Sequence, residues 1–102
     1  MSIFKDIVDE EKERLTNLIK FYEDEIIKLP KGTLSRKKIK NKIYVYLVYR
    51  KNGIHHTEYI GPEDSEKVEK IEKKIKERKE LMKLLKHAKM NLKEVNKFKH
   101  GK

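Results

Sequence analysis

Cysteine is absent from the 102-residue sequence, and only four glycines and two prolines interrupt it. The absence of cysteine excludes disulfide bonds, thiolate metal sites and thiol nucleophiles. No run of about 18 apolar residues occurs, so the sequence predicts no membrane span. The first residues have neither the basic start nor the apolar middle of a secretory signal peptide, and we therefore expect a cytoplasmic protein.

Charge is abundant, and it is unevenly distributed. Charged residues make up 43% of the chain, against roughly 25% in ordinary globular domains, which leaves little apolar material for a thick core. The formal net charge is +10, and residues 31–61 alone hold eight basic side chains and one acidic one. A second basic block lies in residues 66–102. This distribution predicts a polyanionic partner, with an anionic membrane surface as the weaker alternative.

A β-hairpin is predicted over residues 42–61, where two β-rich runs meet at Asn52-Gly53, the dipeptide suited to a type I′ turn. This turn places Lys51 opposite Ile54, and it pairs Leu47, Tyr46 and Val45 with Glu58, Tyr59 and Ile60. Side chains alternate across a strand, so the register defines two faces. We expect a core face with Ile43, Val45, Leu47, Tyr49, Ile54 and Ile60, and an outer face with Tyr44, Tyr46, Val48, Arg50, His55, Thr57 and Tyr59.

A further strand is predicted at residues 34–40, which completes a three-stranded antiparallel meander over 33–61. A three-residue connection, with Asn41 in the left-handed conformation, would place Ile39 opposite Ile43 on the core face. A two-residue connection around Asn41-Lys42 would instead put Ile39 on the outer face. We favour the first register because it buries Ile39, and it then adds to the outer face Arg36, Lys38 and Lys40.

Long helices are predicted on both sides of this sheet in the sequence, one over residues 1–30 and one over 64–96, followed by a frayed basic tail at 97–102. Pro30 ends the first helix, and Asp64 or Ser65 can cap the second. Apolar residues recur at three- and four-residue steps in both helices, which indicates an antiparallel coiled coil. The predicted fold is therefore a single α+β domain, with a homodimer expected through the helices.

The candidate binding residues lie on the outer face, where basic side chains can neutralise phosphates and tyrosine rings can stack on bases. The alternatives are that the tyrosines only stabilise a small sheet by cross-strand packing, with or without a helix over them, or that they form a protein interface. The predicted nucleic-acid-binding residues are Arg36, Lys38, Lys40, Tyr44, Tyr46, Arg50, His55 and Tyr59.

Catalytic and metal sites are not indicated. His55 and His56 are neighbours on a strand, so they point to opposite faces and cannot bind one metal ion together. No carboxylate pair, activated serine or glycine-rich phosphate loop is recognisable in the sequence. We therefore expect neither an enzyme nor a cofactor.

Three short stretches of the chain resemble a family of small prokaryotic proteins of unknown function. They are Leu-Pro-Lys-Gly-Thr-Leu at 29–34, the tyrosine-rich strand ending in Tyr-Arg at 44–50, and Tyr-Ile-Gly at 59–61. The similarity covers about residues 29 to 85 and implies no activity.

The order of three strands and a helix, with basic and aromatic strand residues, is more distantly similar to the arm-type DNA-binding domain of tyrosine recombinases and to N-terminal segments of some transposases. That resemblance implies a sheet placed in the DNA major groove, with contacts from Arg36, Lys38, Tyr44, Tyr46 and Arg50. The chain has no recombinase catalytic domain, so recombination is not implied.

Two hypotheses about function remain open at this point. The first is a non-catalytic nucleic-acid-binding protein that contacts duplex DNA through the sheet, as a small regulator or mobile-element accessory factor. The second is a structural or adaptor protein that binds a protein partner through its coiled-coil helices. DNA is favoured over RNA as the nucleic acid.

Overall fold

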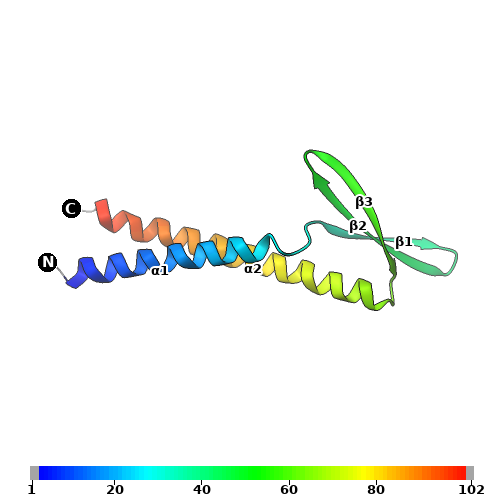
Figure 1. Cartoon of the computed structure of the whole chain (residues 1–102), viewed down its shortest axis with the longest axis horizontal. Coiled ribbons are helices and arrows are strands. Elements are labelled where there is room, and N and C mark those ends of the chain that lie inside the picture. The colour runs from blue at the N-terminus through cyan, green and yellow to red at the C-terminus, as the bar shows by residue number, and fades with distance from the viewer. Residues whose placement is uncertain (1–2, 101–102) are drawn as a thin grey trace. The chain divides into compact units, whose positions relative to one another are not determined.

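The computed structural model describes residues 3–100 and contains two helices and one antiparallel sheet (Figure 1). The order is α1 (Ile3–Ile26), β1 (Thr33–Ile39), β2 (Lys42–Lys51), β3 (Ile54–Pro62) and α2 (Glu66–His100). The predicted α+β fold is confirmed. The chain divides into a helical unit, built from residues up to Lys28 and from Glu80 onward, and a sheet unit over Leu29–Lys79.

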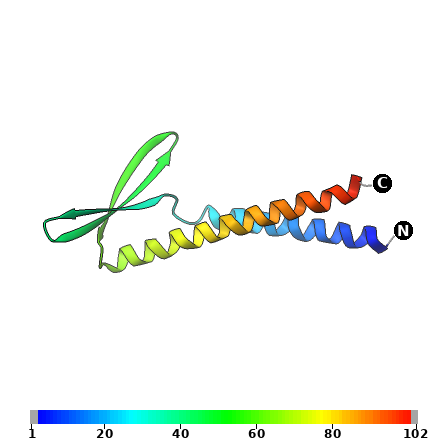
Figure 2. The same ribbon diagram turned by 180° about the vertical axis from the view of Figure 1, so that it is seen from behind.

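In the helical unit, α1 and the C-terminal part of α2 run antiparallel, side by side, in both views (Figures 1 and 2). Near the chain ends, the rings of Phe4 and Phe98 meet edge to face with centroids 6.0 Å apart. Farther along, Lys89 Nζ lies 3.6 Å from a carboxylate oxygen of Glu23. The predicted helix pair is confirmed. Helix α2 extends to His100, beyond the end expected at residue 96. Fraying of residues 97–100 stays a prediction, and residues 101–102 lie outside the described part.

The sheet unit has the strand order β1-β2-β3, and the first turns of α2 pack on one of its faces. The capping prediction is confirmed at Ser65, whose Oγ accepts a hydrogen bond from the Val68 N–H at 3.3 Å. This cap starts α2 directly after β3, so that its apolar side faces the sheet. The buried side chains of this core are Val45, Leu47, Ile60, Val68 and Ile75.

The β2–β3 hairpin follows the predicted register from its turn to the middle of the strands. Asn52 and Gly53 both have positive φ, and Leu47 and Tyr46 pair with Glu58 and Tyr59 as predicted. The prediction fails beyond this point, because a β-bulge pairs Val45 with Gly61 and leaves Ile60 as the extra residue. Ile54 is on the core face but is 62% exposed, so it does not join the core as predicted.

The predicted β1 register is wrong by one residue. The turn consists of Lys40 and Asn41, and Lys38 and Ile39 pair with Ile43 and Lys42. Lys40, rather than Asn41, has the positive φ, at 57°. A shift of one residue exchanges the two faces of a strand, so Arg36 and Lys38 move to the core face and Ile39 to the outer face.

Leu34 explains why this register is preferred. Leu34 and Ile39 are an odd number of positions apart, so they lie on opposite faces of β1 and only one of them can face α2. In the structure Leu34 pairs with Leu47 and packs against the core, whereas Ile39 is 47% exposed. The predicted register would have exposed Leu34 in order to bury Ile39.

Candidate functional site

The outer face of the sheet gathers three tyrosines from two strands. Tyr46 pairs directly with Tyr59, and their ring centroids are 5.3 Å apart. Tyr44 lies diagonally from Tyr59 at 6.3 Å. Within the sheet unit α2 covers the core face, and Tyr59 remains 50% exposed. The three rings therefore form a tyrosine cluster that a ligand can reach from the open side of the sheet.

Basic side chains surround this tyrosine cluster. Lys37 of β1 pairs with Tyr44, Lys42 begins β2 two positions before Tyr44, and Arg50 lies toward the opposite end of β2. All three cations are exposed, and none has an ion-pair partner within the described part of the chain. The outer-face residues that the structure describes include no carboxylate, because the acidic residue of the strands, Glu58, is on the core face. The face therefore carries uncompensated positive charge around an aromatic centre.

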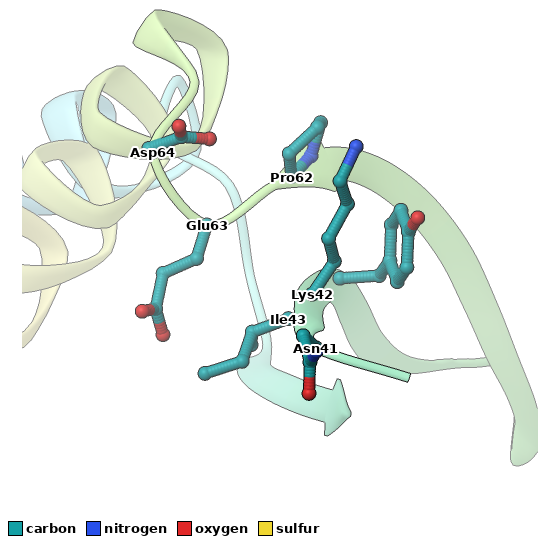
Figure 3. Close-up of a pocket in the computed structure, with 7 residues that line it drawn as sticks. Asn41, Lys42, Ile43, Pro62, Glu63 and Asp64 are labelled. Carbon is teal, nitrogen blue, oxygen red and sulfur yellow. The ribbon is translucent and has the colours of Figure 1, made fainter. Parts of the chain in front are cut away.

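A shallow hollow borders this face at the end of the sheet near the β1–β2 turn, and residues 41–44 and 62–64 line it (Figure 3). Pro62 is the partner of Tyr44 in the sheet, so the hollow continues the outer face beyond the tyrosine cluster. Figure 3 shows the Lys42 side chain extending past Pro62, while the Glu63 side chain points in a different direction. Lys42 therefore adds its charge to the outer face rather than to the acidic side of the hollow.

Arg36 and Lys38, which were expected on the outer face, lie on the core face. Arg36 Nε donates to a carboxylate oxygen of Glu63 at 2.9 Å, and its Nη2 donates to one of Glu72 at 2.7 Å. The hydrogen bonds that Arg36 donates, first to Glu72 and second to Glu63, raise the pKa of its guanidinium above the ordinary value. Arg36 thus joins β1 to the start of α2, and its charge is compensated within the protein.

The remaining predicted site residues of the hairpin lie on the outer face, as its register requires. His55 pairs with Arg50 on the outer face and is exposed. His56, on the core face, stacks on Tyr49 with ring centroids 5.2 Å apart and an interplanar angle of 12°. Lys40 lies in the exposed turn between β1 and β2. The structure therefore brings together on the outer face Tyr44, Tyr46, Arg50, His55 and Tyr59.

Sequence reasoning missed Ser35, Lys37 and Lys42 as members of this face. Ser35 and Lys37 pair with Tyr46 and Tyr44, so their side chains share the face of the tyrosine cluster. Leu34 is the signal that could have identified Ser35 and Lys37, since burying Leu34 against Leu47 fixes the face of each residue in β1. Lys42 could have been identified from β2 alone, because it lies two positions before Tyr44 and so shares its face.

Among the described residues, no group of three or more histidine, aspartate or glutamate side chains is placed to hold a metal ion. Neither helix, over the same residues, is long and apolar enough to cross a bilayer.

Comparison with known proteins gives one match. A family model described as a domain of unknown function (DUF6788) matches residues 5–70, which is more than half of the chain. No curated protein and no solved structure matches the sequence or the fold. The matched range includes α1 from Lys5 onward, the whole sheet and the first turn of α2.

Proposed function

The chain belongs to this family of unknown function, so we propose an activity from its own surface: it is a non-catalytic nucleic-acid-binding protein that uses the outer face of its sheet. The observation that supports this proposal is the tyrosine cluster on a face that has, among the residues the structure describes, three cations without an ion-pair partner and no carboxylate. We take duplex DNA as the expected ligand, and the protein as a small regulator or accessory factor of a mobile element.

The distribution of charge supports a polyanion as the ligand of the sheet unit. Residues 29–79 contain fifteen basic and seven acidic side chains, whereas the helical unit contains twelve and ten. Most of the excess positive charge therefore belongs to the unit that presents the outer face. Lysine and arginine at such a face release condensed counterions when they contact phosphates, which supplies sequence-independent affinity.

The tyrosines supply a second kind of contact. Their rings are tilted against one another by 49° and 57°, so they also stabilise the sheet by cross-strand packing. Packing alone does not require the surrounding face to be free of acidic residues. Tyr59 is half-exposed and lies 6.3 Å, between ring centroids, from Tyr44, the tyrosine beside Lys37 and Lys42. The Tyr59 ring can pack on sugars or bases while the cations bind the backbone phosphates.

Fluorescence anisotropy of labelled duplex DNA, single-stranded DNA and RNA, titrated with nuclease-treated protein at several salt concentrations, tests the proposal. We expect duplex binding with a steep salt dependence. Lys37→Ala should weaken binding on any sequence and reduce the slope of log K against log salt by about 1, because one phosphate contact is lost. Lys42→Ala and Arg50→Ala should act in the same way.

The chain offers a closely matched control for this experiment. Lys38 is next to Lys37 in β1 and has the same side chain, but it pairs with Ile43 on the core face. Lys38→Ala changes the net charge by the same amount as Lys37→Ala. If the outer face contacts the nucleic acid, Lys38→Ala should leave the slope of log K against log salt unchanged, because Lys38 is not on that face. Equal effects of the two substitutions, or no binding by the unaltered protein near physiological salt, would refute the proposal.

A further inference from the structure

The helical unit exposes large apolar side chains and buries few of them. Among the residues of this unit whose burial the structure describes, the buried apolar ones are Leu15, Ile26 and Ala88, whereas Ile7 and Phe98 are 58% and 61% exposed. Two helices held by so few buried side chains are marginal, since tertiary packing supplies most of the stability of helices in water. We therefore expect one face of the unit to bury its apolar side chains against another protein surface.

A groove between the helices identifies that face. Its lining includes Leu15, Leu18 and Tyr22 from α1, and Leu84, Ala88 and Asn91 from α2. Residues three, four or seven positions apart share a helix face, so Ile7 continues the α1 wall and Phe98 continues the α2 wall toward the chain ends. We name this surface, the groove with Ile7 and Phe98, the groove face.

We propose that the groove face binds a second copy of this chain, so that two helical units form a symmetric four-helix bundle. The size of the face agrees with this occupant. The 24 residues of α1 span about 36 Å, and two helices each about 10 Å wide give a face of about 700 Å². Stable protein interfaces bury about 800 Å² on each partner.

Charge favours a second copy over an unrelated partner. The α1 helix has eight acidic and four basic side chains, whereas α2 from residue 80 to 100 has six basic and two acidic ones. A two-fold arrangement that places α1 of one copy beside α2 of the other therefore brings opposite charges together. Arg14, which also lines the groove, is already paired with Glu11, so it does not add an uncompensated charge to the face.

Sedimentation equilibrium of the full-length protein over a range of concentrations gives the test. The unaltered protein should sediment at twice the monomer mass at micromolar concentrations. Leu84→Glu places a charge at the groove face and should shift the protein to a monomer. Met90→Glu is the matched control, since Met90 is an exposed apolar residue of the same helix that does not line the groove, and this variant should remain a dimer.

A third variant keeps the test informative if Leu84→Glu reduces helix content by circular dichroism. Asn91→Leu makes the groove face more apolar, and it should lower the dimer dissociation constant at least tenfold while leaving helix content unchanged. The proposal would be overturned if the unaltered protein were still a monomer at about 100 μM, a concentration above the dissociation constants of ordinary dimers. Equal dissociation of the Leu84→Glu and Met90→Glu variants would also overturn it.

Discussion

Of the three glycines that the structure describes, Gly32 leaves the least room for a side chain. It has φ of +129°, and a Cβ at this position would lie 2.5 Å from the backbone oxygen of Val48. The backbone of β2 cannot move away from the added Cβ without disturbing the sheet. We expect Gly32→Ala to lower the free energy of unfolding by about 2 kcal/mol or more, through strain and steric conflict.

Gly53 provides the comparison for this prediction. It has φ of +77° in the β2–β3 turn, with no atom within 4 Å of an added Cβ, so Gly53→Ala should cost only the backbone strain of about 1 kcal/mol. Urea denaturation followed by circular dichroism measures both variants. A Gly32→Ala protein as stable as the Gly53→Ala protein would contradict the placement of Gly32 against β2.

The cap of α2 is a second effect at this scale. Ser65→Ala removes the acceptor for the Val68 N–H and should cost about 1 kcal/mol. Ser35→Ala is a suitable control, because Ser35 is exposed on the outer face of β1, and it should leave the urea midpoint unchanged. Equal midpoints for both variants would show that the cap contributes nothing to stability.

Among the elements, the hairpin was the most predictable and β1 the least. Asn52-Gly53 permits positive φ at two successive positions, which fixes the loop length and therefore the pairing from Lys51 to Tyr46. The β1–β2 turn has no such signal, because Lys40 adopts positive φ despite its side chain. The bulge at Ile60 could not be predicted from the sequence either. The residue after Ile60 is Gly61, which has no side chain, so the extra residue leaves the alternation of apolar and polar side chains unchanged.

The ion pairs of Arg36 connect two elements and give a prediction at that scale. Arg36→Gln leaves Glu63 and Glu72 without their shared cation, so the melting temperature should fall at low salt. The difference from the unaltered protein should shrink at about 1 M salt, where the Debye length is about 3 Å. Differential scanning fluorimetry at the two salt concentrations measures this difference.

Lys38→Gln is the control for that measurement. Lys38 has no ion-pair partner within the described residues, although it shares both strand and face with Arg36. Its melting temperature should therefore match that of the unaltered protein at both salt concentrations. A loss in Arg36→Gln that does not depend on salt would show that packing of the guanidinium, rather than its charge, is what matters.

For the molecule as a whole, the sequence predicted the class of fold and the positions of the tyrosines and Arg50, but not the lysines beside them. Tyr44, Tyr46 and Tyr59 share the outer face through the hairpin register alone. The lysines of β1 depend on one further register, and a single-residue error exchanged Lys37 for Lys38. Composition fixes how much charge the chain has, whereas strand pairing decides which charges act together.

The two proposals together predict a dependence of binding on the length of the nucleic acid. A dimer carries two outer faces, so a long duplex that spans both should bind more tightly than a short one through a higher effective concentration. Leu84→Glu should weaken binding to the long duplex at least tenfold and change binding to the short duplex little. Anisotropy titrations with duplexes of two lengths test this, and equal loss on both lengths would argue against the two-face explanation.

Strand β1 has a consequence for how the protein behaves when it is concentrated. It is an edge of the sheet, and its backbone is available for pairing with a strand from another molecule. Lys37 and Lys38 follow one another along this edge on opposite faces, so an incoming copy of the same strand would meet positive charge on both sides of the sheet. The residues that distinguish the two faces thus also oppose fibril-like growth of the sheet at this edge.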